Sequence, residues 1–94
     1  MKAVAILVAL SGLLLGANAD SHGACGCQIN SDGAIDTDAT QTCCQRFGGT
    51  STYLSTSGKV RFAGEYCLKN NIDGDSFHNC CRQFLSRGDS ACPW

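Results

Sequence analysis

The chain has 94 residues, among them seven basic side chains, eight acidic side chains and eight cysteines. A formal net charge of −1 excludes the basic stripe of a nucleic-acid-binding domain and provides no electrostatic attraction to anionic lipid. So short a chain also buries little apolar surface on folding, so we expect cross-links to supply much of its stability.

The first 19 residues have the features of a secretory signal peptide. Lys2 gives a positive start, residues 3–17 are apolar apart from Ser11 and two glycines, and Ala17-Asn18-Ala19 fits the small-x-small cleavage rule. The apolar run is about 15 residues, short of the roughly 20 that span a bilayer, which argues against a transmembrane segment. The sequence therefore predicts a signal peptide at 1–19 and a single extracellular domain at 20–94.

All eight cysteines follow the expected cleavage site, and an even number in a small secreted chain predicts four disulfides. Each bond contributes about 2–4 kcal/mol, so together they can exceed the roughly 3–5 kcal/mol that a small core supplies. Zinc ligands usually occur as C-x2-C pairs, whereas this chain has one C-x-C and two doublets, so we expect no metal and no cofactor. The disulfide cysteines are Cys25, Cys27, Cys43, Cys44, Cys67, Cys80, Cys81 and Cys92.

The motif I-D-x-D-x4-C-C-x2-F occurs twice, at 35–47 and at 72–84. A single cysteine that ends an apolar stretch precedes each copy, Cys27 in the first half and Cys67 in the second. We interpret the two halves as copies of one unit, a cysteine-bearing strand followed by a short helix with a cysteine doublet.

Local signals place the elements in chain order. We expect a loose N-terminus (20–24), a strand (24–29), a turn (30–33), a helix from Asp36 or Thr37 to Phe47, a strand (50–56), a hairpin turn (57–58), a strand (59–69), a helix from Asp73 or Asp75 that ends at 87–88, and a short terminal strand (91–94).

The strand at 59–69 alternates most clearly. Its apolar face carries Val60, Phe62, Tyr66 and Leu68, and its polar face carries Lys59, Arg61, Glu65 and Lys69. Alternation puts Cys67 on the polar face without an evident reason, and Gly64 suggests a bulge. We expect Phe62 and Phe84 to belong to the core.

The predicted fold class is α+β, a small disulfide-rich βαββαβ sandwich in which two helices cover one face of a four-stranded antiparallel sheet. Eight cysteines allow 105 pairings, so the exact connectivity stays open. Cys27 and Cys67 are expected to staple the helices to the sheet. Cys25 and Cys92 are expected to tie the chain ends to the remaining doublet members.

Candidate catalytic groups have simpler structural roles. The pairs Asp36/Asp38 and Asp73/Asp75 resemble acid–base carboxylates, but each pair stands where a helix begins and where Asp caps backbone N–H groups. His78 has neither a nucleophile elbow nor a free thiol beside it in the sequence. We therefore expect no catalytic residue and no enzymatic activity.

A rigid, cross-linked scaffold suits binding, because it lowers the entropy cost of association. The residues expected to form a binding surface are Tyr53, Lys59, Arg61, Lys69 and Trp94. For the two aromatic residues, covering a sheet edge or packing on a disulfide is an equally good interpretation.

The cysteine pattern resembles that of small secreted proteins of filamentous fungi. A C-x-C at Cys25 and Cys27 is followed by the doublets Thr42-Cys43-Cys44 and Asn79-Cys80-Cys81, with one cysteine between them. This is similar to the biotrophy-associated secreted protein group of plant-pathogen effectors, which itself resembles the α/β sandwich of a virus-encoded smut-fungus killer toxin. The resemblance covers residues 20–94. It implies secretion into the apoplast or interfacial matrix and a role in virulence, with no catalytic residues.

We therefore expect a monomeric, non-enzymatic effector that binds a host or extracellular protein or a cell-wall component. One alternative is a secreted antimicrobial or killer-type toxin, although membrane-active toxins are usually cationic and this chain is slightly acidic. A second is a hydrophobin-like surface protein. Hydrophobins order their cysteines as single, doublet, single, single, doublet, single, whereas this chain has single, single, doublet, single, doublet, single.

Overall fold

The computed structural model describes residues 21–94, so the expected signal peptide and its cleavage site lie outside the described residues. The elements are β1 (Ser21–Gln28), α2 (Thr37–Phe47), β2 (Thr50–Leu54), β3 (Gly64–Asp73), α3 (Gly74–Phe84) and β4 (Asp89–Ala91). The predicted order β-α-β-β-α-β is confirmed. Within residues 21–94 no helix is long and apolar enough to cross a membrane.

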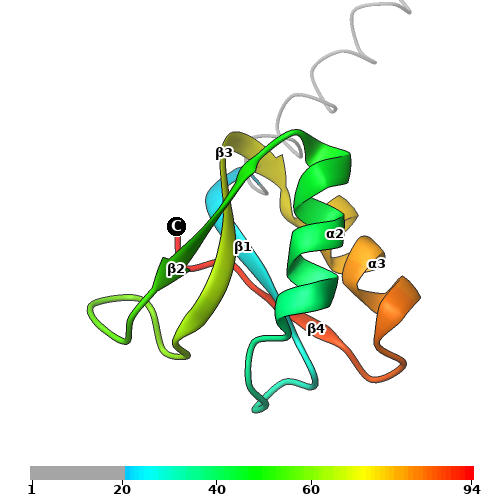
Figure 1. Ribbon diagram of the computed structural model, residues 1–94, viewed down its shortest axis with the longest axis horizontal. Helices are drawn as coiled ribbons and strands as arrows, with labels where there is room; N and C mark the ends of the chain where they lie inside the picture. Colours follow the sequence, from blue (N-terminus) through cyan, green and yellow to red (C-terminus); the bar gives the residue numbers. More distant parts are fainter. Residues whose placement is uncertain (1–20) are drawn as a thin grey trace, which may run out of the picture.

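The four strands form one antiparallel sheet in the order β2-β3-β1-β4. Figure 1 shows both helices on the same face of this sheet, where α2 lies against β3 and α3 lies against β1 and β4. The predicted fold class, a disulfide-rich α+β sandwich, is therefore confirmed.

Four disulfides hold the two layers together. Cys27 of β1 is bonded to Cys81 of α3, and Cys67 of β3 is bonded to Cys44 of α2, so each helix is stapled to the sheet as the strand and helix positions predict. The other two bonds are Cys25–Cys92 and Cys43–Cys80. The expectation that Cys25 and Cys92 reach the doublets was wrong. Gly26 pairs with Ala91, so the cysteines next to them meet across β1 and β4, and the two helices share the remaining bond.

The face of the sheet beneath the helices contains the disulfide core. Cys67 of β3 belongs to this face. The face of β3 that the sequence pattern predicted to be polar is therefore buried at its centre and carries charged residues only towards its ends. Tyr66, its neighbour in the strand, points the other way and is also buried. The sheet thus has apolar groups on both faces, and the cysteines mark the face that the helices cover.

The aromatic core residue is Phe77, which is fully buried and lies with its ring centroid 5.3 Å from that of Phe47. The expectation that Phe84 is a core residue was wrong. Phe84 is the last residue of α3, is 45 % exposed and lies under the guanidinium of Arg46 at 5.2 Å. Phe62 is half-buried and lies outside the disulfide core, in the loop between β2 and β3.

Several strand boundaries differ from the prediction. β1 begins at Ser21 instead of after a loose segment, because Ser21 and His22 pair with the end of β3. The register shifts after His22, where Gly23 of β1 lies opposite residues 69–71 of β3, so the extra residues are in β3. Gly64, where a bulge was expected, pairs regularly with Leu54. The N–H groups of Gly23 and Ala24 donate to the carbonyl oxygen of Trp94 at 2.6 and 2.9 Å, which ties down both ends of the described chain.

β3 begins at Gly64 instead of at residue 59, because its partner strand ends there. Leu54, the last residue of β2, pairs with Gly64, so residues 59–63 have no neighbouring strand. Ser57 and Val60 close a tight turn instead, with Gly58 at φ 55°. Similarly, β4 occupies 89–91, and Pro93 beyond it has no N–H to donate to the ladder. α3 ends at Phe84, before the predicted stop at 87–88.

The two copies of the repeated motif begin their helices differently. Asp36 caps α2, and its Oδ2 accepts a hydrogen bond from the N–H of Ala39 at 2.9 Å. Asp73 caps α3 without a side-chain bond to the backbone, and its carboxylate accepts from the hydroxyl of Ser76 at 2.6 Å. Identical motif residues therefore carry unequal shares of helix stability.

We expect Asp36→Ala to lower the free energy of unfolding by about 1 kcal/mol, because it leaves an N–H at the start of α2 without its acceptor. Asp73→Ala is the matched control and should cost clearly less, since no capping bond is lost. Urea unfolding of both variants measures the difference. Equal losses would show that the two caps act alike in solution.

Candidate ligand-binding cleft

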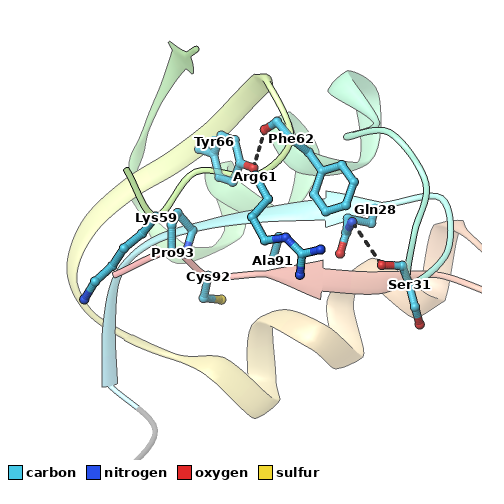
Figure 2. Close-up of a pocket in the computed structure, with 9 residues that line it drawn as sticks. All are labelled: Gln28, Ser31, Lys59, Arg61, Phe62, Tyr66, Ala91, Cys92 and Pro93. Carbon is cyan, nitrogen blue, oxygen red and sulfur yellow. Dashed lines mark hydrogen bonds between the residues drawn. The ribbon is translucent and has the colours of Figure 1, made fainter. Parts of the chain in front are cut away.

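A cleft of about 240 Å³ opens on the face of the sheet that the helices leave uncovered. The ends of β1 and β4 form its floor, and the loop between β2 and β3 (residues 55–63) overhangs it (Figure 2). The residues that line it are Gln28, Ser31, Lys59, Arg61, Phe62, Tyr66, Ala91, Cys92 and Pro93.

Gln28 is the polar group at the floor and is only 3 % exposed. Its Nε2 donates to the carbonyl oxygens of Gly33, at 3.0 Å, and Ser31, at 3.5 Å. Because both partners are acceptors, they fix which end of the amide is nitrogen. Its Oε1 has no hydrogen-bond partner among residues 21–94 and faces the cleft on the side of Arg61 (Figure 2).

Lys59 and Arg61 supply the charge of the cleft. Both side chains are exposed, and neither forms a salt bridge within residues 21–94, where the one such contact joins His78 and Asp89. The guanidinium of Arg61 lies 5.7 Å from the centroid of the Phe62 ring. The lining residues include no Asp or Glu, so the cleft offers two cations and a carbonyl acceptor to an incoming group.

Tyr66 forms the back wall and holds the loop in place. It is 1 % exposed, and its hydroxyl donates to the carbonyl oxygen of Phe62 at 2.6 Å. The ring lies close against Gly26 of β1, where a Cβ atom would come 3.0 Å from Tyr66 Cδ2. A larger residue at position 26 would therefore push the ring, and with it the loop, away from the sheet.

Burial raises the pKa of Tyr66 above its ordinary value of 10.0. The unfolded chain therefore loses this proton at a lower pH than the folded protein does. The stability that Tyr66 contributes is complete below pH 10.0 and is lost as the pH rises through the folded pKa.

We expect Tyr66→Phe to lower the free energy of unfolding at pH 7 by about 1 kcal/mol, the cost of one hydrogen bond. The same variant should lose less stability than the wild type between pH 9 and pH 11, since the titrating hydroxyl is gone. Urea unfolding across this range tests both effects. A parallel decline in the two proteins would show that Tyr66 is not the group responsible.

The structure places the five expected surface residues on different parts of the molecule. Lys59 and Arg61 line the cleft. Tyr53, which is 61 % exposed, pairs with Glu65 and so points to the other side of the sheet, as does Lys69. Trp94 is half-exposed and lies beside Gly23.

Sequence reasoning missed the other lining residues. Phe62 and Tyr66 were expected in the main core, and Gln28 was not considered. Successive side chains of a strand point to opposite faces of the sheet. Because Gln28 follows Cys27, this alternation could have indicated that Gln28 faces away from the helices.

Two other clusters look chemical but have a structural explanation. His78 Nδ1 lies 3.3 Å from Asp89 Oδ1 and 3.4 Å from the hydroxyl of Ser90. A catalytic triad needs the serine and the carboxylate on opposite ring nitrogens, so this arrangement does not form one. The sulfur atoms of Cys27, Cys43 and Cys81 lie within 4.8 Å of one another, but all three are in disulfides, and metal binding requires thiolates.

Compared with known proteins, the chain matches no family model, no curated protein and no solved structure.

Proposed function

We propose that this protein is a secreted, non-enzymatic, effector-like protein that binds an anionic host or extracellular component through the cleft. The observation that carries the proposal is the combination of two cations without salt-bridge partners, Lys59 and Arg61, with a carbonyl acceptor on Gln28 that is open to the cleft. A concave site whose lining carries a small number of polar and charged groups is typical of a binding site.

The disulfides support the extracellular part of the proposal. Every cysteine is paired, and a small domain with four disulfides is stable in an oxidising compartment, outside the cytosol. The signal-peptide features of residues 1–19 and the resemblance of the cysteine pattern to fungal effectors agree with this location.

The scaffold also supports binding. The floor of the cleft is strand backbone flanked by the Cys25–Cys92 bond, and the overhanging loop is fixed by the Tyr66 hydroxyl. A ligand would therefore meet groups that are already in place, which lowers the entropy cost of association.

Binding of the oxidised, labelled protein to plant cell-wall and apoplastic material tests this function. We expect Lys59→Ala/Arg61→Ala to weaken binding about 10- to 100-fold, since charge-assisted hydrogen bonds are lost. Lys69→Ala is the matched control, because it removes an exposed cation outside the cleft. Wild-type binding by the double variant would contradict the proposal. Growth inhibition of microbes by the wild type would favour the toxin alternative.

A further inference from the structure

We infer that the cleft takes a uronic-acid residue of an acidic oligosaccharide, with its carboxylate on Arg61 and a hydroxyl donated to Gln28 Oε1. This inference rests on the proposed function and names its ligand. Three features of the cleft lead to it: its charge, its partnerless acceptor and its size.

The charge calls for a carboxylate. Arg61 presents a planar set of N–H donors that matches the two oxygens of a carboxylate. Lys59 lines the cleft with its ammonium directed away from Arg61 (Figure 2), so it adds positive charge to the site and no second donor to the same carboxylate. No acidic side chain among the lining residues competes for these donors.

The acceptor calls for a hydroxyl or N–H donor on the same ligand. Most of the Gln28 side chain is buried, but its Oε1 is open to the cleft and accepts only from a group that donates a proton. An anion that carries acceptors alone, such as sulfate or a fully ionised phosphate, would bind the cations but leave this oxygen without a donor. A sugar acid carries its carboxylate and several hydroxyl donors on one ring.

The size and the walls fit one ring. A volume of about 240 Å³ is smaller than the roughly 300–1,000 Å³ of sites for drug-sized ligands. Phe62 and Pro93 offer apolar surface to the C–H groups of a sugar ring. A peptide that added a strand beside the cleft would meet Pro93, which has no N–H to pair with it.

Calorimetric titration of the oxidised protein with trigalacturonic acid tests the inference. We expect binding that is lost when the probe is methyl-esterified, because esterification removes the carboxylate charge and leaves the ring intact. Arg61→Ala should weaken binding about 10- to 100-fold, and Arg61→Lys, which keeps the charge but loses the planar fork, should fall in between. Lys69→Ala should bind the probe like the wild type.

Several results would overturn the inference. These are equal affinity for the methyl ester, tighter binding of inositol hexaphosphate, or tighter binding of a short peptide through its free C-terminal carboxylate. The outcome is separable from that of the proposed function. If plant material still binds through Lys59 and Arg61 but trigalacturonic acid neither binds nor competes, the ligand class is wrong and the function stands. If the double variant binds plant material normally, the function itself is wrong.

Discussion

Reduction of all four disulfides is expected to unfold the domain. The cluster of buried residues beneath the helices has ten members, and seven of them are cysteines. The others are Ala39, Ile72 and Phe77, too little apolar surface to hold two helices on a sheet without cross-links. Each bond contributes about 2–4 kcal/mol, so their joint loss exceeds the roughly 3–5 kcal/mol of a small core.

Thermal unfolding followed by near-ultraviolet circular dichroism, with and without excess phosphine reductant, measures this effect. We expect a cooperative transition for the oxidised protein and none for the reduced one. The control is oxidised protein incubated with the spent, already oxidised reagent. A cooperative transition that survives complete reduction would show that packing alone specifies the fold.

Phe77→Ala is expected to cost about 3–5 kcal/mol, because it empties the largest apolar position between α3 and the sheet. Phe84→Ala, the matched control from the same helix, should cost less than about 1 kcal/mol. The Phe84 ring is half-exposed and loses mainly its contact with Arg46.

Urea unfolding of the oxidised variants compares the two costs. If Phe77→Ala does not fold, Phe77→Leu keeps the comparison possible and should fall between Phe77→Ala and the wild type. A loss at Phe84 equal to that at Phe77 would contradict the assignment of Phe77 as the aromatic centre of the core.

The helices and their order could be predicted because their signals are local. Asp36 caps α2 and Gly48 ends it at φ 76°, and both features are visible in the sequence beside the repeated motif. The motif also placed Cys27 and Cys67 in equivalent strands. From this equivalence the disulfides between each strand and a helix could be predicted. The fold class follows from this order of elements.

The assignment of faces could not be predicted, because alternation separates two sides of a strand without saying which side a helix will cover. The charged residues around Cys67 made its face look exposed, although it is the face beneath α2. Tyr66 looked like a core residue, and it is buried, but under a loop on the opposite side. The strand pattern correctly indicated that Tyr66 is buried, but which residues bury it depends on the tertiary structure.

The cleft depends on tertiary structure even more strongly. It joins Gln28 of the first strand, Arg61 of a central loop and Pro93 near the C-terminus. No local pattern connects these three positions. Lys59 and Arg61 were identified by charge alone. The carbonyl acceptor of Gln28 became part of the site only in the folded sheet, where β1 and β4 lie side by side.

A disulfide map of the purified protein tests the central claim most directly. This claim is that cross-links hold both helices on one face of the sheet and leave the other face for binding. Electron-transfer mass spectrometry can resolve the adjacent cysteines of each doublet. The map should contain the bonds Cys25–Cys92, Cys27–Cys81, Cys43–Cys80 and Cys44–Cys67, with no unpaired thiol. A bond from Cys25 or Cys92 to either doublet, or a free cysteine, would contradict it.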